Sequence, residues 1–213
     1  MKKAIALGGL IMMLCGCARL PVASRTVEKA SLFWSARDLQ DHALGNHHFI
    51  LIVIHDSDLA HRLGVTVLQE GGLHFLTLGV YENEALGSLE LRRNYWTDVQ
   101  AVREGHAPER HVHWYARDFD IESHRIKIPS GKTEEQMIRR LLGLADIFER
   151  NTHSQKPKYT PEDNNCSAWV NKMLQLVGIA EAERLELGEF DGIDWGEEDL
   201  LEDKLFQDQH SGP

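Results

Sequence analysis

An apolar run at residues 45–54 most constrains how this chain folds. In this segment, Gly45, Asn46, His47 and His48 are followed by six consecutive apolar residues, four of them β-branched. Such a run, without alternation of polar residues, is typical of a strand buried on both faces. Segments 73–81, 88–93 and 121–128 predict further strands, with a turn over residues 82–87 joining the first two as antiparallel partners.

Helical patterns dominate the second half of the chain. Thr133 and Gln136 have the spacing of a capping box, and an apolar stripe with helical period follows them. A second stripe runs from Cys166 to Val177, with Asn164 or Asn165 as N-cap and Gly178 after its end. Residues 31–44 predict a short early helix that stops at Gly45. The expected fold class is therefore α+β, an antiparallel sheet followed by helices.

Cys166 is the residue with the clearest chemical potential. It lies in the first turn of its predicted helix, where the helix dipole favours the thiolate and free backbone amides can hold an oxyanion. The same position also begins a buried stripe, and free cysteine is among the most buried residue types. Asp163 would oppose activation if its charge lay close to the sulfur. Nucleophile and buried core residue are the two interpretations of Cys166.

The N-terminus has the features of an export signal. Lys2 and Lys3 precede a short apolar segment that is too short to span a bilayer. It ends in Leu14-Cys15-Gly16-Cys17, which resembles the lipobox of bacterial lipoproteins, with Cys17 as the lipidated residue. The resemblance implies a signal peptide over residues 1–16, a lipidated tether over residues 17–40, and a membrane partner bound through the acyl chains. Ala18 after the lipidated cysteine implies the outer membrane of the cell envelope, facing the periplasm.

Cysteine count and charge narrow the possibilities further. Of the three cysteines, Cys15 leaves with the signal and Cys17 is acylated, so Cys166 has no partner for an internal disulfide. An exported chain with one free thiol is expected either to bury it or to use it. Removing residues 1–16 takes away Lys2 and Lys3 and lowers the formal net charge from −10 to −12. This acidity argues against nucleic acid as a partner.

A cysteine nucleophile needs a nearby base, and the early strands supply histidines. His47 and His48 open the first buried strand on opposite faces, and His74 begins a later strand. Histidines at the ends of two adjacent strands, facing the N-terminus of the cysteine helix, would satisfy the geometry of such a site.

His48 followed by an aromatic residue, the later strand with His74, and the Asn165-Cys166 pair resemble a known family. It is the circularly permuted papain-like fold of the lecithin:retinol acyltransferase-like branch of the NlpC superfamily. The resemblance covers roughly residues 45–178, which gives a domain over residues 41–180 and an acidic C-terminal extension over residues 181–213. It implies Cys166 as nucleophile, His48 as general base and His74 as orienting residue, with His47 as an alternative base.

The function that the resemblance implies is cysteine-dependent hydrolysis or acyl transfer through an acyl-thioester. The substrate would be an amide or ester, either a cell-wall peptide or a lipid, and no cofactor or metal is expected. Two other classes stay open. The cluster His106, His111 and His113 suggests a metal protein, although a strong further ligand is missing. A non-catalytic, membrane-anchored binding or accessory lipoprotein would instead bury Cys166. Protein partners are not indicated by the sequence.

Overall fold

The computed structural model describes residues 28–38, 46–70, 73–104, 113–115, 120–160, 165–190 and 201–208. The predicted signal peptide, the lipidated Cys17 and most of the tether lie outside these residues. So do His106 and His111 of the alternative metal cluster, and only the backbone of His113 is described.

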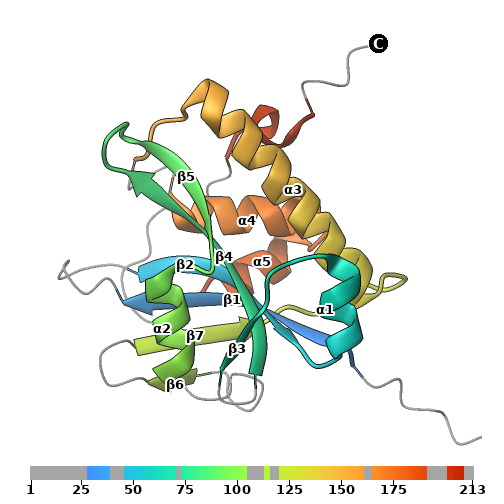
Figure 1. Cartoon of the computed structure of the whole chain (residues 1–213). Coiled ribbons are helices and arrows are strands. Elements are labelled where there is room, and N and C mark those ends of the chain that lie inside the picture. Colours follow the sequence, from blue (N-terminus) through green and yellow to red (C-terminus); the bar gives the residue numbers. More distant parts are fainter. Residues whose placement is uncertain are drawn as a thin grey trace, which may run out of the picture.

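One antiparallel sheet organises the described part of the chain. Its strands are β1 (Ala30–Asp38), β2 (Asn46–Ile54), β3 (Leu68–Glu70), β4 (Leu73–Asn83), β5 (Ser88–Arg93), β6 (His113–Tyr115) and β7 (Asp120–Arg125). The order is β3-β4-β2-β1-β7-β6, and β5 also pairs with β4 (Figure 1). All strand pairs are antiparallel. The α+β class with an antiparallel sheet is therefore confirmed.

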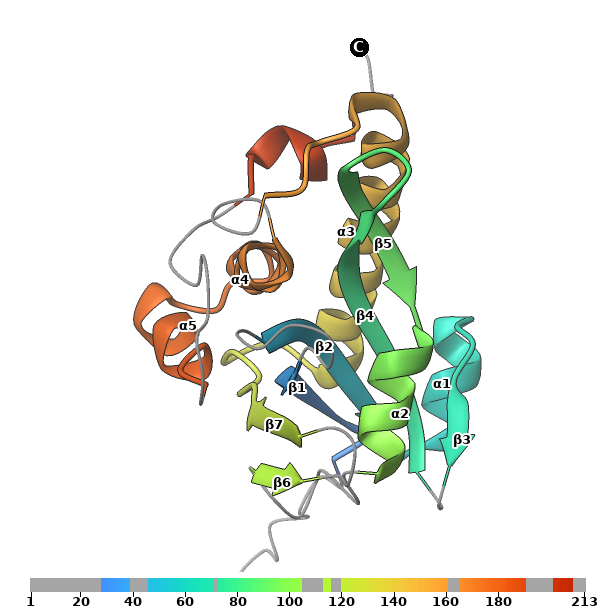
Figure 2. The same ribbon diagram turned by 90° about the vertical axis from the view of Figure 1, so that its left-hand side faces the viewer.

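Helices cover both faces of this sheet. They are α1 (Ser57–Leu63), α2 (Trp96–Glu104), α3 (Glu134–Gln155), α4 (Cys166–Leu176) and α5 (Glu181–Leu187), followed by the 3-10 turn η2 (Asp203–Phe206). Figure 2 shows α4 and α5 on one side of β1 and β2, with α2 on the other side. Two apolar clusters result, a large one beneath α3 and α4 and a smaller one beneath α2.

Strand β2 is the central strand that its apolar run predicts. Ile50 and Ile52 belong to the large cluster, whereas Phe49 and Leu51 belong to the small one, and all four are fully buried. Because successive side chains of a strand point to opposite faces, an apolar run without alternation suits a strand that is covered on both sides.

Strand β1 corrects two predictions. Residues 31–44 were expected to form a short helix. Instead β1 pairs with β2 along its whole length and with β7 on its other edge. Trp34 faces the large cluster and Phe33 the small one, so β1 too is covered on both sides. Residues 30–38 therefore belong to the sheet, where the sequence predicted a tether up to residue 40.

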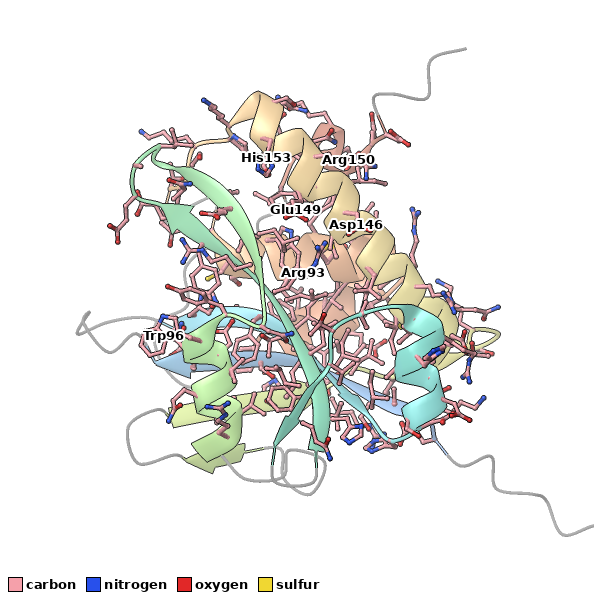
Figure 3. All side chains as sticks on the ribbon, in the orientation of Figure 1. Arg93, Trp96, Asp146, Glu149, Arg150 and His153 are labelled. Carbon is pink, nitrogen blue, oxygen red and sulfur yellow. The ribbon has the colours of Figure 1, made fainter. Side chains whose placement is uncertain are left out.

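Local signals explain the long helix α3. Thr133 caps it, and the reciprocal hydrogen bonds between Thr133 and Gln136 form the predicted capping box. The β4–β5 hairpin extends alongside this helix, beyond the end of β2 (Figure 1). Arg93 of β5 ties the two together, because its guanidinium contacts Asp146 at 2.6 Å and Glu149 at 3.1 Å (Figure 3).

The residues after 180 are part of the folded body in both stretches that the structure describes. Arg184 of α5 donates to Asn171 of α4 at 2.7 Å. Farther on, Phe206 of η2 stacks on Phe148 of α3, with ring centroids 5.2 Å apart. Residues 181–190 and 201–208 of the acidic C-terminal extension therefore pack against the rest of the domain.

None of the helices in the described ranges combines the length and the hydropathy needed to cross a bilayer.

Candidate active site

Cys166 is the first residue of α4, and the helix start is firmly fixed. The Asn165 side chain accepts a hydrogen bond from the Ala168 amide at 2.9 Å, which confirms Asn165 as the N-cap. Cys166 is buried, with 7% of its surface exposed. The amides of Cys166 and Ser167 begin the helix and so have no acceptor inside it. They are donors available to a developing negative charge beside the sulfur.

The thiol lies where two strands of the sheet separate. The pairing of β2 with β4 ends at Phe49 and Gly79, and beyond Gly79 β4 pairs only with β5 in the described residues. The next amide of β2, that of His48, donates to the Sγ of Cys166 at 3.4 Å. The sulfur thus takes the position of a strand partner, which brings it to the edge of β2 and within reach of side chains on both faces.

His47 is the histidine whose side chain couples to the thiol. The charge of its imidazolium favours the thiolate of Cys166, and its buried Nε2 has no hydrogen-bond partner among the described residues. The ring stacks on Tyr81 at a centroid distance of 4.3 Å, and its Nε2 lies 3.6 Å from Oδ1 of Asp98. A Cβ added to Gly79 would lie 3.1 Å from this Nε2, so the absence of a side chain there makes room for the ring.

Asp98 lies behind His47 and is fully buried on α2. Arg37 of β1 donates from Nε to Oδ1 at 2.9 Å, and the Tyr81 hydroxyl donates to Oδ2 at 2.5 Å. Arg37 also donates to Thr97 at 2.7 Å, which fixes the first turn of α2. A buried carboxylate held by a cation and a hydroxyl can orient an imidazole and stabilise its positive charge.

The surroundings of Cys166, His47 and Asp98 shift the pKa of each group in the direction that favours its charged form. Burial raises the pKa of Cys166, but the charge of His47, and after it the charge and backbone amide of His48, outweigh burial and bring the pKa from 9.0 down to about 7. Burial lowers the pKa of His47, and the charges of Asp98 and Cys166 together raise it above its usual value. Burial raises the pKa of Asp98, while His47 and Arg37 hold it below its usual range. The shifts of Cys166 and His47 both favour a thiolate beside an imidazolium over a neutral pair.

His48 lies next to the thiol, but its side chain has another partner. The indole Nε1 of Trp34 donates to Nδ1 of His48 at 2.9 Å, and both side chains are buried. Indole N–H groups only donate, so Nδ1 is an acceptor and the neutral ring carries its proton on Nε2. Phe190 meets the ring edge-on at 5.1 Å. This geometry favours His47 over His48 as the base, and His48 contributes its backbone amide.

His74 is not brought to the site. It pairs with Ile54 at the opposite end of β2. Seven residues of strand separate Ile54 from His47, which corresponds to roughly 23 Å at about 3.3 Å per residue. The expectation that His47 or His48 and His74 share one end of the sheet is wrong, because β4 runs antiparallel and its first residues meet the last residues of β2.

Two charged residues of the site, Asp98 and Arg37, were not singled out by the sequence reasoning. Asp98 lies one turn from Val102 on the face of α2 that covers the small apolar cluster. Arg37 shares a face of β1 with Phe33. A charged residue on an otherwise apolar helix face is the signal that could have found Asp98, because buried charges are rare unless they are paired. Arg37 shares its face with Ser31 and Ser35 as well as Phe33 and gives no comparable signal.

Comparisons with known proteins give no relative for this arrangement: no family model matches the chain, nor does any curated protein or solved structure. Among the described residues, no group of three or more His, Cys, Asp or Glu side chains is placed to hold a metal ion.

Proposed function

We propose that this protein is a cysteine-dependent hydrolase or acyltransferase that acts on an amide or ester through an acyl-thioester. The observation that carries the proposal is the buried group at the end of the β2–β4 ladder, where the charge of His47 lowers the pKa of Cys166 and Asp98 lies 3.6 Å from Nε2 of His47. Nucleophile, base and orienting carboxylate come from three separate elements, as such sites require geometry rather than sequence order.

The residues allow a complete reaction cycle. The Cys166 thiolate attacks the acyl carbon, and its oxygen takes the negative charge toward the first amides of α4. As the carbon–nitrogen or carbon–oxygen bond breaks, the His47 imidazolium gives its proton to the leaving group. Neutral His47 then takes a proton from water or another acceptor, whose oxygen or nitrogen attacks the thioester. The acyl group leaves, and the thiolate–imidazolium pair is restored.

The resemblance to the permuted papain-like fold supports the same chemistry. In that fold the strand bearing the base precedes the helix bearing the cysteine, and here β2 precedes α4. This proposal assigns the base to His47 and the orienting role to Asp98, in place of His48 and His74. Location in the cell envelope, lipidation at Cys17 and a cell-wall peptide or lipid substrate remain part of the proposal on sequence grounds.

The direct test is the rate of carboxamidomethylation of Cys166 by iodoacetamide as a function of pH, localised by peptide mass spectrometry. The full chain, purified in detergent, is expected to react with a midpoint near the lowered pKa of about 7. His47→Ala is expected to move the midpoint upward, because burial then acts without the imidazolium. His48→Ala keeps its backbone amide and is expected to raise the midpoint less than His47→Ala does, because the charge of His47 is the larger cause of the lowered pKa.

A binding lipoprotein is the second candidate, and the small exposed fraction of Cys166 favours it. It predicts a thiol that iodoacetamide reaches only after denaturant is added, with no dependence on His47. That result would overturn the enzymatic proposal. Circular dichroism of each variant separates loss of reactivity from loss of fold.

A further inference from the structure

Arg92 lies on the same face of the sheet as the candidate active site. It pairs with Gly79 across β4 and β5, and Gly79 is the residue over which the His47 ring lies. The neighbouring Arg93 points to the opposite face, where Asp146 and Glu149 of α3 bind it (Figure 3). Two adjacent arginines therefore have different surroundings, and only Arg92 faces the side of His47.

Aromatic rings connect Arg92 to His47. The Arg92 guanidinium lies over Tyr81 at 5.3 Å and over Tyr95 at 4.6 Å from the ring centroids. Tyr81 in turn stacks on His47. Tyr95 contacts Trp96, which is 63% exposed and stands at the start of α2 (Figure 3). The contacts form a continuous path from the surface to the base.

The guanidinium has donors left for a ligand. It carries five N–H groups in a planar fork, and its stacking on the tyrosines leaves the edge of the fork open. In the described part of the chain it makes one side-chain hydrogen bond, to Glu90 at 3.3 Å. The Arg92 side chain is 30% exposed and that of Glu90 42% exposed. An ion pair of this kind contributes little, so a better-placed anion can compete with it.

We propose that Arg92 binds an anionic group of the substrate and thereby sets its specificity. This inference rests on the proposed function. The ligand chemistry is a pair of oxygen atoms, as a carboxylate or a phosphate offers to a guanidinium. The two ring contacts place the fork within roughly 10 Å of His47, a span of about three extended residues. The substrate is therefore an acyl compound with an anionic group within about three residues of the bond that is cleaved.

The test uses alkylating probes of different lengths, which measure the distance from Cys166 to the anion site without a known substrate. N-iodoacetyl derivatives of glycine, diglycine and triglycine are compared with the corresponding carboxamides on the full chain. In each reaction the Cys166 sulfur bonds to the probe carbon and iodide leaves. We expect one length to react about tenfold faster as the carboxylate than as the carboxamide, the scale of one charge-assisted contact.

Three variants assign that preference. Arg92→Met is expected to abolish it, and Arg92→Lys to retain part of it, since an ammonium is a point charge without the fork. Glu90→Gln is expected to increase it by removing a competing anion. Arg93→Met makes the same change in net charge on the other face and is expected to leave the preference unaltered.

The outcomes separate the two proposals. A thiol that reacts with none of the probes overturns the proposed function itself. A thiol that reacts with equal rates for carboxylate and carboxamide at every length, or whose preference survives Arg92→Met, overturns the role of Arg92 alone. N-iodoacetyl phosphoethanolamine against N-iodoacetyl ethanolamine supplies the phosphate arm. A larger preference there assigns the site to a lipid-like phosphate, and a larger preference in the glycine series assigns it to a peptide carboxylate.

Discussion

Adjacent histidines at the start of β2 have different roles because a strand alternates its side chains. His47 projects to the face of α2, where Arg37 and Tyr81 bind the buried carboxylate of Asp98. His48 projects to the face of α4 and α5, where Trp34 donates to its Nδ1. A one-residue difference in sequence therefore decides which imidazole lies beside the buried Asp98 carboxylate.

Gly79→Ala tests the fit around His47. The new Cβ would lie 3.1 Å from Nε2 of His47 and 3.3 Å from the Cβ of Phe49, so the imidazole must move. We expect the alkylation midpoint of Cys166 to rise toward 9.0, with a loss of about 1–3 kcal/mol in unfolding free energy from overpacking.

Gly143→Ala is the matched control for that change. A Cβ on Gly143 of α3 meets nothing within 4 Å, and alanine favours the helix by about 0.5–1 kcal/mol. It is expected to stabilise the protein slightly and to leave the midpoint unchanged. An unchanged midpoint in Gly79→Ala as well would contradict the placement of His47 described above.

The lowered pKa of Cys166 also predicts how stability depends on pH. A thiol with a pKa of about 7 when folded and 9.0 when unfolded adds stability as pH rises from about 7 to about 9. The contribution is lost as pH falls through the folded value. His47, with its raised pKa, has the opposite sign and loses its contribution only as pH rises through its own folded value.

Urea denaturation of the wild type and of Cys166→Ser checks this prediction. The difference in unfolding free energy is expected to grow in favour of the wild type by at most about 3 kcal/mol from pH 7 to pH 9. A difference that stays constant over this range would mean that the thiolate is not stabilised by folding.

Among the elements, α4 is the one whose start is tied to the site. Asn165→Ala removes the N-cap and is expected to cost about 1 kcal/mol and to lower the alkylation rate of Cys166 at neutral pH, because the first turn then frays. Asn165→Ser, which can still cap, should restore most of both. Thr133→Ala removes the cap of α3 at a similar cost and is expected to leave the alkylation rate unchanged.

Prediction from sequence succeeded for elements whose signals are local. The apolar run of β2 and the caps Thr133 and Asn165 depend on neighbouring residues only. Strand β1 was expected to be a helix, although its sequence alternates as a strand does. Apolar Ala30, Leu32, Trp34 and Ala36 occupy one face, and Ser31, Phe33, Ser35 and Arg37 the other. The proposal places the base at His47 rather than His48, and Asp98 was not predicted, because α2 brings it to His47 across 51 residues of chain.

At the scale of the whole molecule, the C-terminal residues complete the core. Leu205 and Phe206 are buried, and Asn151 of α3 donates to the carbonyl of Leu205 at 3.0 Å. Phe206→Ala is therefore expected to lower the unfolding free energy by about 3–5 kcal/mol, measured by urea denaturation. Lys204→Ala, on an exposed side chain of the same turn, should stay within about 0.5 kcal/mol. Equal effects of the two would show that η2 does not pack as described.

The unfinished ladder between β2 and β4 also has a consequence for the order of assembly. The amide of His48 is 118 residues away in sequence from the sulfur that accepts its hydrogen bond. Until α4 has been synthesised and docked, that amide has no partner, and an open strand edge is a template for self-association. The sulfur therefore occupies the open edge of β2 at a late stage of folding. It also means that the thiol meets His47 and His48 only after α4 has docked, so a fragment without α4 lacks the contacts that lower the pKa of Cys166.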